Sequence, residues 1–251
     1  MTQLVHSDTY PAIQSSVNTH DGKAVFITGA SKGLGQAMAI SFAEAGASKI
    51  AIGARSSLDV TANKIRDAAV SLYGRSPDIL ALHLNVADVR SVSSAESRIR
   101  EEFGHLDLLI NNAGIVTRGL IAEGDPHEWQ QAWQVNLIGT YHMLRSFIPL
   151  LLDGGDKTII NVSSVGAHCT TKTYSAYETS KLAILRLTEF ACVEYGDSGL
   201  LAYSIHPGNV PTNINGGIEG IAPEMRHGKP QIYYLLLIWE SDLTNSLTSI
   251  C

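Results

Sequence analysis

The sequence has little cysteine, few charged residues and no long apolar run. Of its 251 residues, three are cysteines, namely Cys169, Cys192 and Cys251. Their odd number and wide separation indicate reduced thiols rather than a disulfide framework, and their spacing does not match a metal site. We therefore expect a reducing, cytoplasmic compartment and no bound metal. The longest late apolar run, 232–239, is shorter than a membrane-spanning helix requires.

Basic residues are also scarce and do not cluster. Lysine and arginine number 18 against 24 acidic residues, which gives a formal net charge of -6. Nucleic acids and anionic membranes require a positively charged surface, so we expect neither as a partner. Residues 1–22 do not contain a basic region followed by an apolar core, so a secretory signal is not expected. With 45% hydrophobic and 17% charged residues, the composition is typical of a soluble globular protein.

What the chain does contain is a regular alternation of short β-branched runs and amphipathic segments. A chain of this length can bury one sizeable core. Strands are expected at 23–28, 49–53, 79–84, 106–110, 158–162 and 201–206. Helices are expected from just after Gly35 to about residue 45, and at 57–73, 89–103, 126–152 and 174–195. This alternation predicts an α/β protein with a single Rossmann-type, doubly wound parallel sheet flanked by helices.

Glycine-rich and polar clusters follow the expected strands. Ligands of such sheets bind beyond the carboxyl ends of the strands, which all lie along one edge. The clusters found at those ends are 29–35, Arg55, Asn85, 111–114, 163–164 and 207–208. The sequence therefore predicts one binding site assembled from six segments.

The first cluster has the glycine spacing of a nucleotide-binding loop. Gly29, Gly33 and Gly35 allow a tight turn and a close approach to a pyrophosphate, and the following helix offers amide donors at its N-terminus. At the end of the second strand, proteins that bind NAD usually have an acid for the ribose hydroxyls. This chain has Arg55 there and Lys32 in the first loop, which favours NADP. Two solvated surface cations remain the alternative.

A tyrosine and a lysine four residues apart predict acid/base chemistry. Tyr177 and Lys181 lie on one face of an expected helix, with Ser164 thirteen residues upstream of the tyrosine. A free tyrosine loses its proton only near pH ~10. A nearby ammonium favours the phenolate and brings that proton within reach at neutral pH. Ser164 could hydrogen-bond the same substrate oxygen.

With these residues assembled, the chain closely resembles the short-chain dehydrogenase/reductase family, in a branch similar to fungal members. The resemblance covers roughly residues 10–212. The matching motifs are 28–35 (TGASKGLG), 111–114 (NNAG), Asn136, Ser164, Tyr177, Lys181 and 207–208 (PG). It implies hydride transfer between NADP(H) and a carbonyl or secondary alcohol.

The resemblance also implies a role for each matching residue. Tyr177 would be the acid/base, Lys181 would lower its pKa and hold the nicotinamide ribose, Ser164 would polarise the substrate oxygen, and Asn136 would hold a water linked to Lys181. The implied cofactor contacts are Gly29, Ser31, Lys32, Gly33, Leu34, Gly35, Arg55, Asn85, Val86, Asn112, Ala113, Gly114, Tyr177, Lys181, Pro207, Gly208, Val210 and Thr212. Asn85 stands where the family often has an aspartate, so a weakened adenine contact is expected at most.

The three expected regions are an N-terminal arm (1–22), an NAD(P)-binding catalytic domain (23–212) and a divergent lid or tail of that domain (213–251). The tail does not match the family pattern. Its apolar run 232–239 either forms an edge strand, or the substrate lid is altered or missing, which would leave a catalytically impaired dinucleotide-binding or oligomer-forming protein. Both alternatives remain open. The resemblance further implies a homodimer or homotetramer built on the helices 126–152 and 174–195, and a small-molecule substrate such as a ketone of secondary metabolism.

Overall fold

The computed structural model describes residues 20–208 and Ile214, so most of the expected arm and tail, with Val210 and Thr212, lies outside the described residues. The elements, in chain order, are β1 (Ala24–Thr28), α1 (Gly33–Glu44), β2 (Lys49–Ala54), α2 (Asp59–Tyr73), β3 (Asp78–His83), α3 (Val89–Phe103), β4 (Leu108–Asn111), α4 (Pro126–Trp133), η2 (Gln134–Ile138), α5 (Gly139–Leu152), β5 (Thr158–Val162), η3 (Val165–Ala167), α6 (Ser175–Tyr195), η4 (Gly196–Ser198) and β6 (Leu201–Ile205).

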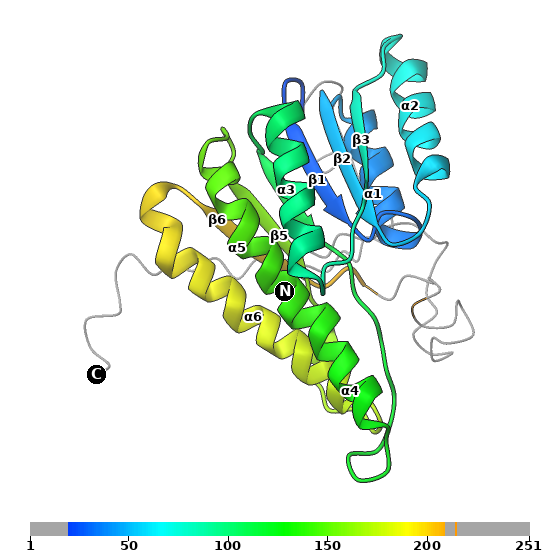
Figure 1. Ribbon diagram of the computed structural model, residues 1–251, viewed down its shortest axis with the longest axis vertical. Coiled ribbons are helices and arrows are strands. Elements are labelled where there is room, and N and C mark those ends of the chain that lie inside the picture. The colour runs from blue at the N-terminus through cyan, green and yellow to red at the C-terminus, as the bar shows by residue number, and fades with distance from the viewer. Residues whose placement is uncertain (1–19, 209–213, 215–251) are drawn as a thin grey trace, which may run out of the picture.

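The six strands form one parallel sheet in the order β3-β2-β1-β4-β5-β6 (Figure 1). This confirms the predicted Rossmann-type fold. The chain first winds outward from β1 to β3 and then returns to start again at β4, on the other side of β1. Ligands of doubly wound sheets bind at this reversal, beyond the carboxyl ends of the two central strands.

Helices cover both faces of the sheet, and the alternation of side chains along β1 shows how (Figure 1). Phe26 belongs to a core cluster shared with α3, α5 and α6. Val25 and Ile27 belong to a second cluster shared with α1 and α2. All five residues of β1 are buried, as expected for a strand covered on both faces. Within residues 20–208, the structure contains no helix that is long and apolar enough to cross a membrane.

The expected helix 126–152 differs from the observed one in its middle. The structure has α-helix on either side of a π-helical segment, η2, which contains Asn136. A π-helical segment widens one turn, and such segments are frequent at functional sites. The spacing of hydrophobic residues does not distinguish a short π-helical segment from a continuous α-helix. The sequence therefore predicted the helix but not its π-helical segment.

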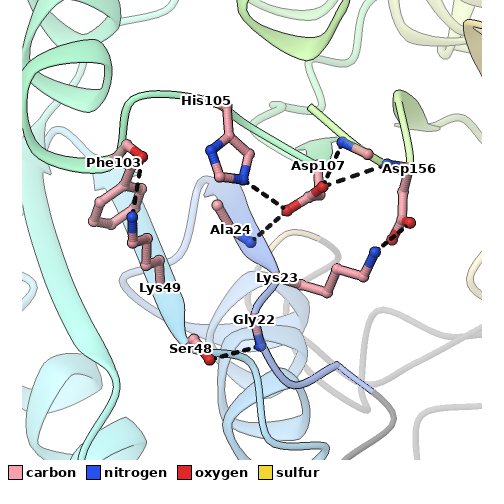
Figure 2. Close-up of polar contacts among 10 residues, drawn as sticks. Gly22, Lys23, Ala24, Ser48, Lys49, Phe103, His105, Asp107 and Asp156 are labelled. Atoms are coloured by element: carbon pink, nitrogen blue, oxygen red, sulfur yellow. Dashed lines mark hydrogen bonds and ion pairs between the residues drawn. The ribbon is translucent and has the colours of Figure 1, made fainter. Parts of the chain in front are cut away.

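The amino-terminal edge of the sheet is tied together by Asp107 (Figure 2). This buried carboxylate accepts hydrogen bonds from the backbone N–H groups of Ala24 (2.8 Å), Gly155 (2.8 Å) and Asp156 (3.3 Å), and His105 Nε2 lies 3.4 Å from it. These contacts join β1 to the segments before β4 and β5. The strand β4 begins at Leu108, two residues later than expected, although the Asp107 backbone already bonds to Ala24 and Thr158.

Candidate active site

The loop from β1 to α1 has the geometry of an anion-binding turn. Gly29 and Gly33 have φ angles of 68° and 59°, in the left-handed region that favours glycine. A Cβ on Gly35 would lie 2.5 Å from the Gly29 carbonyl oxygen, so no side chain fits there. Lys32, the N-cap residue of α1, makes no side-chain capping bond. The first amides of α1 are therefore not capped by that side chain, and the loop fits a dinucleotide pyrophosphate.

The segment after β4 is bonded directly to the end of β1. Thr28 Oγ1 accepts hydrogen bonds from the N–H groups of Asn112 and Ala113, both at 3.0 Å, and Asn112 Nδ2 donates to the Thr28 carbonyl oxygen at 2.9 Å. Sequence reasoning did not assign Thr28 a role, although a hydroxyl residue directly before the glycine loop was a usable signal. A Cβ on Gly114 would lie 3.2 Å from Asn136 Oδ1 and 3.6 Å from Lys181 Nζ, so this backbone passes close to the catalytic candidates.

The predicted determinants of cofactor choice lie at neighbouring strand ends. Arg55 follows β2, Lys32 lies in the loop after β1, and both residues are exposed. Thr28 and Gly53 are register partners, which brings these two strand ends side by side. Within residues 20–208, neither cation forms an ion pair. After β3, the Asn85 Oδ1 accepts from the Ala87 N–H at 3.2 Å.

Lys181 is a buried lysine with a fixed ammonium. Its Nζ donates a 2.7 Å hydrogen bond to the carbonyl oxygen of Val162, the last residue of β5, and only 5% of the residue is exposed. Burial lowers the pKa of Lys181 to about 8. The same ammonium lies 5.7 Å from the centre of the Tyr177 ring.

The protonation of Tyr177 differs from the sequence expectation. Lys181 was expected to lower its pKa, but in this structure the pKa of Tyr177 is raised, chiefly because burial disfavours the phenolate. A hydrogen bond with Ser164 acts in the opposite direction, and Glu178 adds to the increase. The physical reason is that the Lys181 ammonium lies over the ring and donates to Val162, so that in this chain alone desolvation decides the direction.

Asn136 joins three parts of the site. It is fully buried in η2. Its Oδ1 accepts from the Ile115 N–H (2.9 Å), and its Nδ2 donates to the Ile115 carbonyl oxygen (3.0 Å) and to Ser180 Oγ (3.0 Å). Ser180 Oγ in turn donates to the Tyr177 carbonyl oxygen at 2.6 Å. Asn136 thus links the segment after β4 to the helix of Tyr177, and its role as a water ligand stays a prediction.

The two serines after β5 have different tasks. Ser163 is buried, and its Oγ donates to the Lys181 carbonyl oxygen at 3.0 Å. Ser164 is partly exposed, and its Oγ accepts from the Gly166 N–H at 3.1 Å at the start of η3. Ser164 is also the serine that acts on the Tyr177 phenol, where it favours a lower pKa. Ser163 therefore connects the end of β5 to α6, and the role of Ser164 towards a substrate oxygen stays a prediction.

A family model described as short chain dehydrogenase matches residues 23–220, which is most of the chain. The chain belongs to the short-chain dehydrogenase/reductase family. Among curated proteins, it is 48% identical over 235 residues to the short chain dehydrogenase mpl6 of Monascus purpureus, covering 93% of this chain and 80% of that protein.

Solved structures of similar fold carry either cofactor. An alcohol dehydrogenase from Thermococcus sibiricus, complexed with 5-hydroxy-NADP, aligns with a TM-score of 0.69 at 27% identity, over 83% of this chain and 82% of that one. A carveol dehydrogenase from Mycobacterium avium, in complex with NAD, aligns with a TM-score of 0.73 at 24% identity, over 82% and 76%. The fold of a short-chain dehydrogenase therefore leaves the choice between NAD and NADP to particular side chains.

The remaining predicted positions within residues 20–208 lie along the same edge of this short-chain dehydrogenase. Ser31 is in the β1–α1 loop, Leu34 is in the first turn of α1, and Val86 is buried after β3. Pro207 and Gly208 follow β6, and Gly208 has a φ of 79°. Val210 and Thr212 lie outside the described residues.

Proposed function

We propose that this short-chain dehydrogenase transfers a hydride between NADP(H) and a small carbonyl or secondary alcohol substrate. The observation that carries the proposal is the convergence of Ser164, Tyr177, Lys181 and Asn136, which are joined by hydrogen bonds and ring contacts at one edge of the sheet. The family resemblance supplies a role for each.

In the proposed reaction, the protein moves a proton and orients the reactants. Tyr177 gives its phenolic proton to the carbonyl oxygen in reduction and removes it from the alcohol in oxidation. Ser164 donates a hydrogen bond to that oxygen as negative charge develops on it. Lys181 holds the nicotinamide ribose and supports the phenolate, and Asn136 holds a water that resupplies the proton. The bound nicotinamide supplies or accepts the hydride.

The preference for NADP rests on charge at the second strand end. Arg55 and Lys32 offer a planar guanidinium and an ammonium where a 2′-phosphate would bind, and an acid for ribose hydroxyls is absent from the β2 end, 53–56. The other proposed cofactor contacts are the glycine loop, Asn85, Val86, 112–114 and 207–212.

The proposal extends to the setting of the enzyme. We infer a cytoplasmic homodimer or homotetramer that acts on a ketone of secondary metabolism, in line with the similarity to a Monascus short chain dehydrogenase. The exposed Tyr141 on α5, and Leu182, Phe190 and Val193 on α6, are apolar side chains that a partner subunit could cover. Residues 23–212 would form the catalytic domain, and 213–251 its lid or tail.

The test is a fluorescence titration with NADPH and NADH, followed by a panel of ketones under NADPH, with wild type and Tyr177→Phe. Selective binding of NADPH, and turnover that Tyr177→Phe abolishes, would support the proposal. Binding without turnover by the wild type would favour the impaired, dinucleotide-binding alternative. A folded protein that binds neither cofactor would overturn it.

A further inference from the structure

Three polar residues form a row across the sheet beneath the active site. Asn111 on β4, Asn161 on β5 and Ser204 on β6 are register partners. Each lies two residues after a buried apolar residue of the core cluster shared with α3, α5 and α6. Because side chains alternate along a strand, the row faces those helices. Asn161 is fully buried and 5% of Asn111 is exposed.

The row continues into α6 through Thr188. Asn111 Nδ2 donates to Asn161 Oδ1 (2.8 Å), and Asn161 Nδ2 donates to Thr188 Oγ1 (2.8 Å). Thr188 Oγ1 donates to the Ile184 carbonyl oxygen (2.8 Å), which leaves its lone pairs for Asn161 and for the hydroxyl of Ser204 (2.7 Å). The bonds therefore have one consistent direction, and they join three strands to one helix.

Packing alone does not require polar groups at these positions. Ile184 and Ala191, on either side of Thr188 along α6, are apolar and buried. Apolar side chains of similar volume at the positions of Asn161 and Thr188 could fill the same space, because buried polar groups are often replaceable in this way without loss of stability. Apolar contacts are not directional, however, whereas a hydrogen bond of 2.8 Å fixes how far the helix can slide along the strand.

The bond between Asn161 and Thr188 joins the two segments that carry the catalytic residues. Asn161 is followed by Val162, which accepts the Lys181 hydrogen bond, and Ser164 is three residues along. Thr188 lies seven residues after Lys181, which puts it two turns along the same face of α6, about 10 Å away. A shift of α6 along β5 would therefore move Tyr177 and Lys181 relative to Ser164.

We propose that Asn161 and Thr188 are positioning residues, which hold α6 in the one axial position that brings Tyr177 to Ser164 and Lys181 to Val162. This inference rests on the proposed hydride transfer, because it concerns the geometry of the same site. The competing interpretation is that the polar row contributes to folding only.

The decisive variant is Thr188→Val, which keeps the shape of the side chain and removes the hydroxyl. Thr188→Ser restores the hydroxyl and serves as the rescue variant. The matched control is Ile99→Val, which removes one buried methyl group from α3 without touching α6 or β5. For each protein we would measure the melting temperature, the affinity for NADPH, kcat and KM for a turned-over ketone, and the pH profile of kcat.

We expect Thr188→Val to lower kcat roughly 10- to 100-fold, because small misplacements of reacting groups have effects of that size. NADPH affinity should change less than about twofold, since the phosphate loop is on other elements. Thr188→Ser should recover most of the kcat. A Thr188→Val variant that keeps the wild-type kcat and pH profile, or one that loses no more kcat than Ile99→Val, would overturn the proposal.

A second readout does not depend on turnover. The ε-carbon of Lys181 can be titrated by NMR in protein labelled with 13C-lysine, with the signal assigned by its absence in Lys181→Met. Burial lowers the pKa of Lys181 to about 8 from 10.5. A displaced α6 admits water, so the pKa should rise in Thr188→Val and stay unchanged in Ile99→Val. If no ketone is turned over, the proposed function fails, yet an unchanged titration in Thr188→Val would still overturn this inference.

Discussion

Replacing Asp107 by asparagine should weaken the fold at the edge of the sheet away from the active site (Figure 2). One carboxylate oxygen accepts from Ala24, and the other accepts from Gly155 and Asp156. An asparagine has one accepting oxygen, and its amide nitrogen would face a backbone N–H on the other side. At least one buried donor is then left without a partner, in either orientation of the amide.

The expected loss of stability in Asp107→Asn follows from these contacts. Losing a hydrogen bond to a charged group and leaving a buried donor unpaired together cost about 3 kcal/mol. For a chain of this length, that corresponds to a decrease of roughly 6–12 °C in the melting temperature. The assay is urea and thermal unfolding at pH 7, with Asp156→Asn as the control. Asp156 pairs with Lys23 at 2.5 Å, but both side chains are partly exposed, so the control should lose less than about 1 kcal/mol.

The pH dependence of this effect has a defined sign. Burial by itself would raise the pKa of Asp107, but the three backbone N–H donors and His105 outweigh it, so the pKa lies below the ordinary value of 3.8. A carboxyl group whose pKa is lower in the folded state stabilises the fold at any pH above its unfolded-state pKa. This stabilisation is lost as the pH falls through the folded-state pKa. The difference in the free energy of unfolding between wild type and Asp107→Asn should therefore become smaller at acidic pH. Equal stability of Asp107→Asn and Asp156→Asn at pH 7 would refute this reasoning.

Four further predictions concern the active-site edge. Tyr177→Phe should lower kcat at least about 1,000-fold without weakening NADPH binding, as measured by fluorescence titration. Arg55→Asp should weaken NADPH binding more than tenfold and leave NADH binding nearly unchanged, in the same titration. Gly35→Ala should abolish binding of both cofactors while the protein still folds by circular dichroism, because its Cβ would lie 2.5 Å from the Gly29 oxygen. Lys181→Met should abolish turnover yet raise the melting temperature at pH 7, since burial disfavours the ammonium; this gain should shrink as the pH rises from about 8 towards 10.5.

The sequence predicted the sheet because its signals are local and repeated. Apolar runs such as 158–162 read as buried strands, and the clusters after them had to share one edge once the sheet was parallel. That rule alone predicts that Arg55, Asn112 and Ser164 belong to one site. Their roles as binding and catalytic residues stay predictions.

What the sequence did not predict depends on contacts between elements distant in the chain. The widened turn contains Asn136, and the bonds of its side chain to Ile115 and Ser180 join distant segments that no periodicity reveals. The direction of the pKa shift at Tyr177 depends on how deeply the tertiary structure buries the phenol. In both cases the sequence identified the residue but could not predict the environment in which the fold places it.

The two edges of the sheet make opposite contributions to stability. At the carboxyl edge, the fold buries the Lys181 ammonium without a carboxylate partner in the described part of the chain, and burial lowers its pKa because it disfavours the charged form. At the amino edge, Asp107 holds three backbone groups and its pKa is shifted in the direction that stabilises the folded state. The site can therefore contain an unfavourable charge because the fold is secured elsewhere. We therefore expect Asp107→Asn to lower stability at unchanged kcat, and Lys181→Met to remove kcat and raise stability.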